Sequence, residues 1–390
     1  MHELRFPKGL TAQKFLSHYW QRKPLLFRQA LSGFQCGLEP DELAGMACEQ
    51  DIESRLVLEK DGVSPWEARY GPFDEAVFRQ LPESHWTLLV QDVDKHLPEV
   101  ARLLDYFRFI PDWRLDDVMV SYAVDQGSVG PHIDDYDVFL YQARGRRRWK
   151  IHYQAVAEED FIPGLELRIL PDFKAEEEWL LEPGDMLYLP PNLAHWGIAE
   201  GECMTCSIGF RAPTLREMAA AWFESAVEDK LPAVRYRDPP LRPQRDPGEI
   251  QPAALTAFKE QLLSCLGDLS RDNRWFGSFI TEPKEHLQVE PRDNPLTEEA
   301  FLNRFREAAL IHRHGYTRMA FSRDDGDGED TLYANGRRYA LPRESGDFLP
   351  VLTRYREIHF GYLQEWLAQP VYLSLLCRLY NDGHLHFSNE

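Results

Sequence analysis

The sequence is short of the features that mark membrane, secreted and nucleic-acid-binding proteins. No apolar run approaches the roughly 18 residues that a membrane span needs, and the segment Met1–Leu10 lacks the apolar core of a signal peptide. Basic residues are in deficit, because 44 Lys and Arg stand against 64 Asp and Glu, a formal net charge of −20. We therefore expect a cytoplasmic protein without direct nucleic-acid binding, whose macromolecular partner is a basic protein.

Cysteine is also scarce, since the 390 residues contain six scattered copies, which suits a reducing compartment better than a disulfide framework. Two of them, Cys203 and Cys206, form a C-x-x-C pair in a predicted strand. Residues three apart on a strand point to opposite faces, and no second pair completes a four-ligand zinc site. The pair is therefore not expected to bind zinc or to act as a redox motif.

What the sequence does contain is, first, a strand-rich part that runs to about Pro213. Short apolar runs bounded by Gly, Pro and Asp predict a β-sandwich or barrel. Thr11 and Pro40 mark the starts of two helices, as a capping residue and as a proline in the first turn. The clearest strands are predicted at Val118–Val124, Asp137–Gln142, Arg146–His152, Met186–Leu189 and Met204–Phe210.

The pattern changes to helical spacing at Thr214. Apolar residues there predict a helix after Thr214, a second around Leu255–Leu266 and a third around Trp275–Ile280, with a proline-rich loop at Asp238–Pro247. Stripes this apolar need a partner surface. Packing within the chain and a dimer interface account equally well for them.

A polar break at Glu282–Pro295 precedes a compact tail of helices and strands. Thr297 caps a helix, Asn335-Gly336 predicts a type I′ hairpin turn, and a last strand is expected near Leu385–Phe387. Helices with a hairpin suggest a winged helix. The segment Leu375–Tyr380 lacks a basic recognition face, so an interaction or stabilising role is favoured over DNA binding.

The chemistry is carried by three residues, His132, Asp134 and His195. His132 and Asp134 stand two apart in a stretch that is predicted to be extended, so their side chains leave one face. His195 follows the motif Gly184–Pro190, a turn and an apolar strand. Two imidazoles and one carboxylate form the facial triad of non-haem Fe(II) oxygenases, whose open positions would take a 2-oxo acid and O2. A closed structural zinc site would want four ligands, usually with thiolates.

Arg147 is the candidate anchor for 2-oxoglutarate. Strand alternation puts Arg147, Trp149 and Ile151 on one face, and the two apolar residues mark that face as buried. A buried cation is costly without an anion, which the distal carboxylate of 2-oxoglutarate would supply. An internal salt bridge, or a nucleic-acid patch with Arg146 and Arg148, is the alternative interpretation.

Two hydroxyls are further candidates for contact with 2-oxoglutarate. Ser207 lies on the small polar face of its predicted strand, and Ser121 lies on the strand before His132. An ordinary hydrogen bond within the sheet explains either residue almost as well.

At these residues the sequence resembles the JmjC-type ribosomal oxygenases, in particular the bacterial protein-arginine hydroxylase branch. The likeness extends, more weakly, through the helical and winged-helix segments. The segments that carry it are Trp20–Pro24, Pro40–Ala44, Tyr70–Phe73, Pro111–Asp117, Gly130–Asp134, Tyr136–Phe139, Gly145–Trp149 and Gly209–Pro213.

The resemblance implies a mainly β fold with α: a JmjC/cupin double-stranded β-helix catalytic domain at 1–213, a helical dimerisation region at 214–285 and a winged helix at 286–390. It implies Fe(II) ligands at His132, Asp134 and His195, and 2-oxoglutarate contacts at Arg147 and Ser121. Arginine at position 147 resembles the bacterial branch, whereas the eukaryotic histidine hydroxylases carry lysine there. The implied protein is a homodimer.

The implied reaction is hydroxylation of an arginine side chain on a basic large-subunit ribosomal protein, and the acidic charge fits such a partner. Candidate contacts to the substrate guanidinium are Asp125, Asp135, Tyr136 and Asp137. Two rivals remain: demethylation of an N-methyl group on the same site, and a non-catalytic cupin-like ribosome-assembly or DNA-binding factor.

Overall fold

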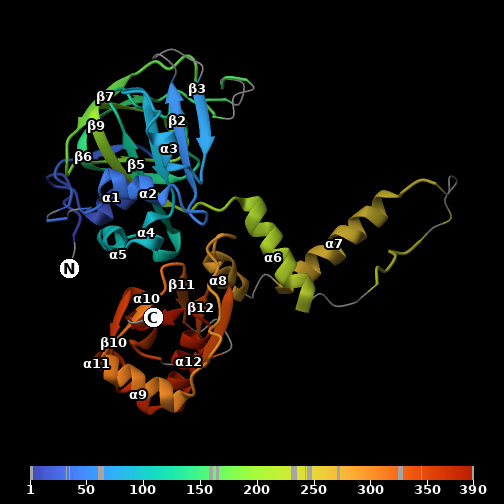
Figure 1. The fold of residues 1–390 in the computed structure, drawn as a ribbon. Coiled ribbons are helices and arrows are strands. Elements are labelled where there is room, and N and C mark those ends of the chain that lie inside the picture. Colours follow the sequence, from blue (N-terminus) through green and yellow to red (C-terminus); the bar gives the residue numbers. More distant parts are fainter. Residues whose placement is uncertain are drawn as a thin grey trace. The chain divides into compact units, whose positions relative to one another are not determined.

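The chain divides into two compact units, Met1–Ala212 and Pro213–Glu390 (Figure 1). The boundary between the units lies between Ala212 and Pro213, and the predicted domains at 1–213, 214–285 and 286–390 stay predictions. The computed structural model describes residues 3–31, 33–34, 36–59, 66–157, 161–163, 167–229, 235–241, 243, 248–269, 273–323, 328–343 and 345–388.

One nine-stranded antiparallel sheet forms the frame of the first unit. Its strands follow the order β1-β8-β6-β9-β5-β4-β2-β3, and β7 pairs with β6 off this path. The strands are β1 (Leu25–Phe27), β2 (Ser54–Glu59), β3 (Trp66–Tyr70), β4 (Trp86–Val90), β5 (Leu115–Ala123), β6 (Asp137–His152), β7 (Glu177–Leu181), β8 (Met186–Leu189) and β9 (Ala194–Phe210).

The two longest strands, β6 and β9, lie side by side at the centre of this sheet. β6 joins the two strands that were predicted separately, because the ladder continues across register shifts between Gln142 and Arg146. Gly145 lies in this irregularity at a φ of +62°, which other residues rarely adopt. The predicted break is therefore a bulge within one strand.

Helices and aromatic side chains cover one side of the sheet. The two predicted helices are present as α1 (Ala12–His18), capped by Thr11, and α2 (Pro40–Met46). Shorter helices are α3 (Glu75–Phe78), α4 (Val93–His96), α5 (Pro98–Ala101), η2 (Arg102–Phe107) and η3 (Asp112–Arg114). The largest fully buried side chains of this core are Phe15, Phe27, Phe107, Phe139, Tyr188 and Phe210.

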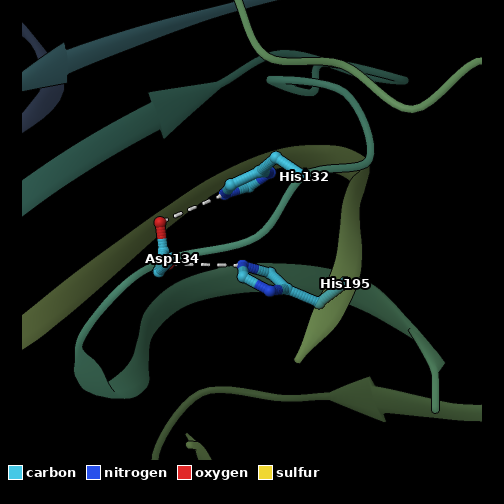
Figure 2. A group of neighbouring side chains, drawn as sticks. All are labelled: His132, Asp134 and His195. Carbon is cyan, nitrogen blue, oxygen red and sulfur yellow. Dashed lines mark ion pairs between the residues drawn. The ribbon is translucent and has the colours of Figure 1, made fainter. Parts of the chain in front are cut away.

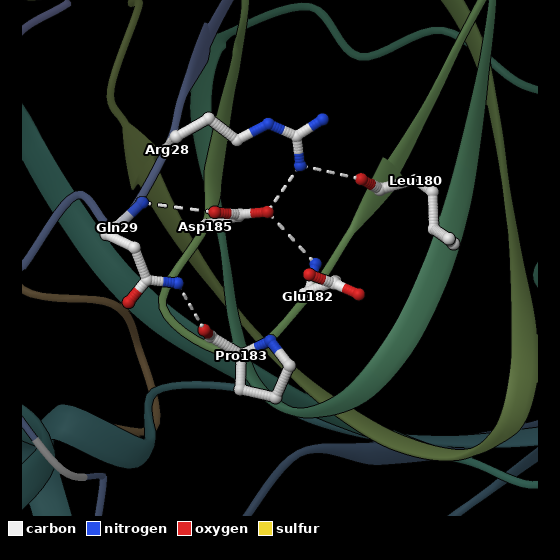
Figure 3. A network of polar contacts seen from close by, with 6 residues as sticks. All are labelled: Arg28, Gln29, Leu180, Glu182, Pro183 and Asp185. Carbon is white, nitrogen blue, oxygen red and sulfur yellow. Dashed lines mark hydrogen bonds and ion pairs between the residues drawn. The ribbon is translucent and has the colours of Figure 1, made fainter.

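Asp185, from the turn before β8, fastens the connection between β7 and β8 to the chain that follows β1 (Figure 3). Its buried carboxylate accepts hydrogen bonds from the backbone N–H groups of Gln29, at 3.0 Å, and Glu182, at 3.1 Å. The Arg28 guanidinium donates to it as well. Because each N–H would otherwise be left without a partner, this carboxylate holds β8 in place directly upstream of His195.

The second unit contains two longer helices and a compact α+β part. The helices are α6 (Leu215–Asp229) and α7 (Pro252–Leu269). The α+β part has two three-stranded sheets, in the orders β14-β10-β15 and β11-β12-β13. Its elements are α8 (Arg274–Thr281), α9 (Glu298–Ala308), β10 (Leu310–Arg313), β11 (Met319–Ser322), β12 (Glu329–Ala334), β13 (Arg337–Pro342), α10 (Phe348–Arg354), β14 (Glu357–His359), α11 (Phe360–Leu363), η5 (Trp366–Ala368), α12 (Pro370–Asn381) and β15 (Leu385–His386).

The predicted hairpin and helix cap of this part are confirmed. Asn335 and Gly336 connect β12 to β13 with φ values of +43° and +79°, the sign that a type I′ turn requires. Thr297 caps α9 by accepting a hydrogen bond from the backbone N–H of Ala300. The proline-rich loop lies partly outside the described residues, at 242 and 244–247.

In the part of the chain that the structure describes, no helix combines the length and the apolar character of a membrane span.

Candidate functional site

The structure brings His132, Asp134 and His195 together (Figure 2). The Nε2 atom of His132 lies 3.8 Å from Asp134 Oδ1, and the Nε2 atom of His195 lies 3.5 Å from Asp134 Oδ2. Among the described residues this is the one group of three or more His, Cys, Asp or Glu side chains whose ligand atoms converge, all within 4.8 Å of one another.

The segment that carries His132 and Asp134 is not the strand that the sequence suggested. Only His132 makes a β-bridge, with His195, and Asp134 lies in irregular chain before β6. The expectation of a strand is wrong because Gly130, with a φ of +80°, turns the chain here, against the side chain of Ile169. His132 and His195 nevertheless converge, since the bridge between their backbones fixes them directly opposite each other.

Both imidazoles are oriented by backbone carbonyls. The Nδ1 atoms of His132 and His195 each lie 2.9 Å from a carbonyl oxygen, those of Gly130 and Leu193. Nδ1–H donates in each pair, because a carbonyl can only accept, and this leaves both Nε2 lone pairs for a metal. Burial, followed by the nearby His132, lowers the pKa of His195 to about 4, so that this imidazole is neutral at neutral pH.

These donors fit a catalytic iron better than a structural zinc. The set has two imidazole nitrogens and one carboxylate, without a thiolate. These are the donors of the facial triad in non-haem Fe(II) oxygenases, which leaves coordination positions open. We therefore carry His132, Asp134 and His195 forward as the proposed iron ligands.

Arg147 is buried as the alternation of its strand predicted. Its side chain is 5% exposed, on the face of β6 that also buries Trp149 and Ile151. Nη1 donates to Ser121 Oγ at 3.4 Å, whereas Nε and Nη2 have no hydrogen-bond partner among the described residues. A buried guanidinium with two unpaired nitrogens is the group that a carboxylate ligand would complete.

Trp149 connects this cation to the histidines. The Arg147 guanidinium carbon lies 5.7 Å from the Trp149 ring centroid, and that ring lies 5.8 Å from the His195 ring. Gly197, on β9, provides the space for the indole, since a Cβ atom there would come within 2.7 Å of the ring. The side chains therefore form a row on the interior face of the sheet, from Arg147 through Trp149 to His195.

The two candidate hydroxyls lie on neighbouring strands. Ser121 on β5 is paired with Thr205 on β9, donates to the Thr205 carbonyl at 3.4 Å and accepts from Arg147. Ser207 is buried two residues further along β9. Ser121 is thus next to the proposed anchor, and the ordinary hydrogen bond within the sheet is present as well.

The four candidate substrate contacts lie in different surroundings. Asp137 is fully buried and accepts hydrogen bonds from Tyr188, Gln21 and Arg114, so we do not carry it forward as a substrate contact. Asp125 accepts from the backbone N–H of Gly201 at 2.8 Å.

Asp135 and Tyr136 are exposed beside Asp134, with Tyr136 43% exposed. The Asp134 carboxylate, then desolvation and the nearby Asp117, raise the pKa of Tyr136, so that its hydroxyl keeps its proton.

Sequence reasoning missed Ser128. Its buried Oγ accepts hydrogen bonds from the backbone N–H of Gly130, at 3.1 Å, and from the indole N–H of Trp196, at 2.8 Å. Gly130 is the residue whose carbonyl orients His132, and Trp196 directly follows His195. One hydroxyl thereby joins the two segments that carry the histidines. A serine in a loop has no local signal for such a role.

Comparisons with known proteins identify a known family of domains in each of the two parts of the chain. A family model described as a JmjC domain matches residues 102–218, and one described as a ROXA-like winged helix matches residues 271–386. The predicted fold class, a JmjC/cupin β domain with a C-terminal winged helix, is confirmed.

The chain is 34% identical to the ribosomal protein uL16 3-hydroxylase of Escherichia coli (strain K12), over 98% of this chain and 100% of that protein. It is 40% identical to a probable ribosomal oxygenase of Haemophilus influenzae, over 54% of this chain and 52% of that protein. The solved structure of YcfD, a ribosomal oxygenase from Escherichia coli, in complex with cobalt and 2-oxoglutarate, matches with a TM-score of 0.83 at 32% identity, covering 100% of both chains.

Replacing Ser128 with alanine is expected to weaken divalent-metal binding about tenfold, because both histidine segments lose a shared hydrogen bond. Calorimetric titration of the apoprotein with cobalt(II) would measure the change. The matched control is Ser54→Ala, which removes another buried hydroxyl, in β2, that donates to Ala47. Unchanged cobalt affinity in Ser128→Ala, or an equal loss in Ser54→Ala, would contradict the positioning role.

Proposed function

The chain belongs to the JmjC-type ribosomal oxygenases, and from this membership we propose that it hydroxylates an arginine side chain of the large-subunit ribosomal protein uL16. It is an Fe(II)- and 2-oxoglutarate-dependent oxygenase, with O2 as the second co-substrate. The substrate is proposed from the name of the full-length relative, a uL16 3-hydroxylase. That the modified residue is an arginine is our inference from the resemblance and from the acidic surroundings of the site.

The observation that carries the reaction type is the pairing of the triad with an unneutralised buried cation. His132, Asp134 and His195 would hold the iron, and Arg147, supported by Ser121, would bind the distal carboxylate of 2-oxoglutarate. When bound, iron and 2-oxoglutarate supply the oxidising power that inserts one oxygen atom of O2 into a C–H bond. The chain's own part is to aim both imidazoles by Nδ1–H hydrogen bonds and to keep that of His195 neutral, since burial lowers its pKa.

Arginine as the substrate side chain is supported by the carboxylates around Tyr136. Asp134, Asp117 and Asp116 all act on its hydroxyl electrostatically, and Arg55 opposes them. Gly209 leaves room for the Asp117 carboxylate, because a Cβ atom there would lie 3.2 Å from Asp117 Oδ1, and the Tyr136 ring lies beside the same glycine. An exposed aromatic ring among carboxylates is a suitable surface for a guanidinium. We propose Tyr136 and Asp135 as substrate contacts on this basis.

We further propose that the protein acts as a homodimer through α6 and α7. Apolar side chains on these helices are exposed to a degree that is unusual for a monomer's surface. Phe223 is 51% exposed, Leu255 50%, Phe258 53%, Leu262 41% and Leu263 66%. A second copy would cover them with the same surface, as two-fold symmetry requires.

The proposed reaction predicts a mass increase of about 16 Da on one arginine of uL16, one oxygen atom, after incubation with the protein, Fe(II), 2-oxoglutarate and O2. Tandem mass spectrometry of the isolated ribosomal protein would locate it. The increase should be absent with His132→Ala and present with His152→Ala, a histidine on β6 outside the triad. Consumption of 2-oxoglutarate without a modified uL16 would show that the substrate is wrong. If 2-oxoglutarate is not consumed at all, a non-catalytic assembly factor becomes the better account.

The dimer predicts a mass near 91 kDa, twice the 45.5 kDa of one chain, in light scattering after size exclusion. The double substitution Phe258→Glu and Leu262→Glu should give 45.5 kDa, because it would bury charges in the interface. Tyr362→Glu is the control, since this tyrosine is 49% exposed on α11. A wild-type monomer, or a charged variant that remains dimeric, would refute the interface.

A further inference from the structure

Two cysteines that lie 170 residues apart in the sequence are in contact in the folded chain. The Sγ atoms of Cys36 and Cys206 are separated by 3.6 Å. Cys206 is fully buried on β9, whereas Cys36 is partly exposed in the segment that leads to α2. Neither belongs to the proposed iron site, and neither is paired in a disulfide.

The surroundings hold the two sulfurs against one another. Both side chains pack in the same apolar cluster. The Phe34 ring, two residues before Cys36, packs edge-on against Tyr141 at 5.6 Å, and Tyr141 is the β6 partner of Cys206. The contact is therefore a product of core packing and not of local chain geometry.

We propose that Cys36 and Cys206 form a reversible thiol switch that hydrogen peroxide closes to a disulfide. The sulfurs would have to approach by about 1.5 Å to reach a bond length of about 2.05 Å. Cys36 lies outside the strands of the sheet, so the approach of its sulfur does not require β9 to lose its pairing with β5.

The two thiols have different roles in this reaction. A hydrogen bond from Cys206 lowers the pKa of Cys36, while the same bond and burial raise the pKa of Cys206. Cys36 is therefore the group that reaches the thiolate form more easily, and it is also the one that peroxide can reach.

The chemistry balances with one peroxide for each disulfide. The Cys36 thiolate attacks one peroxide oxygen, the O–O bond breaks and hydroxide leaves, which gives a sulfenic acid at Cys36. Cys206 loses its proton and its sulfur attacks Cys36, so that the S–O bond breaks and a second hydroxide leaves. The hydroxides are protonated to two waters. The two sulfurs together lose two electrons, and the peroxide gains them.

The disulfide would tie the segment before α2 to β9, the strand that also carries the proposed ligand His195. A hydrogen bond already links the start of α2 to the sheet close by, because Arg144 on β6 donates to Glu39, the residue before α2, at 2.6 Å. A covalent link here restricts the unfolded chain, and it should therefore stabilise the oxidised protein.

Cys203 provides a matched control from the same strand. It is three residues from Cys206 and fully buried, but it packs on the other face with Ala123 and Ala199. The two thiols of the C-x-x-C motif are therefore close in the sequence but lie on opposite faces of the strand. The thiol in contact with Cys206 is that of Cys36, 170 residues earlier in the sequence.

The test uses the full-length protein, reduced, freed of reductant, treated with a small excess of hydrogen peroxide and then alkylated. Peptide mass spectrometry should find a Cys36–Cys206 cross-link, which dithiothreitol reverses, and Tm should rise by about 5 °C. Both effects should persist in Cys203→Ser and disappear in Cys36→Ser, whose partly exposed position keeps the variant folded. Oxidation of Cys36 to sulfinic acid without a cross-link, or a rise in Tm that survives Cys36→Ser, would overturn the proposal.

Discussion

The pairing of β6 with β9 is the constraint on which the site depends. It runs from Asp137 opposite Phe210 to His152 opposite Ala194. Because side chains alternate along a strand, a slip of one residue would turn every inward side chain of β6 outward. The observed register places Ile151 opposite His195 and directs Arg147 into the interior. The proposed iron ligand His195 and the proposed co-substrate anchor Arg147 therefore come from one continuous ladder.

Charge within the site is arranged at a cost to folding. A guanidinium that is 5% exposed with two unpaired nitrogens is unfavourable, and a neutral residue of similar shape would stabilise the unliganded protein. His195 is likewise held neutral by burial, ready to bind a metal without first losing a proton. Both features make sense when the site is completed by a divalent metal and a dicarboxylate. The structure thus gives up stability at the residues that are proposed to bind iron and 2-oxoglutarate.

Local chemistry in the sequence predicted much of this, and long-range packing accounts for the rest. Alternation identified Arg147 as buried, and the Asn335-Gly336 turn and the Thr297 cap were recognised from side-chain chemistry alone. The continuity of β6 through its bulge was missed, since a glycine weakens a strand and the sequence does not show whether the strand continues past it. The hydroxyl of Ser128 and the contact of Cys36 with Cys206 depend on segments that meet only in the folded chain. The spacing of residues along the sequence does not predict contacts between such distant segments.

The most direct test of the account is the affinity of the cobalt-loaded protein for 2-oxoglutarate, measured by calorimetry in Arg147→Gln and Arg148→Gln. Arg148 is the control because its side chain is 38% exposed on the opposite face of β6 and pairs with Glu200. We predict that Arg147→Gln weakens 2-oxoglutarate binding about 100-fold, the loss of a buried charge-assisted pair, with cobalt affinity unchanged. Arg148→Gln should bind as the wild type does. An Arg147→Gln variant with wild-type affinity for 2-oxoglutarate would contradict the anchor and the site built around it.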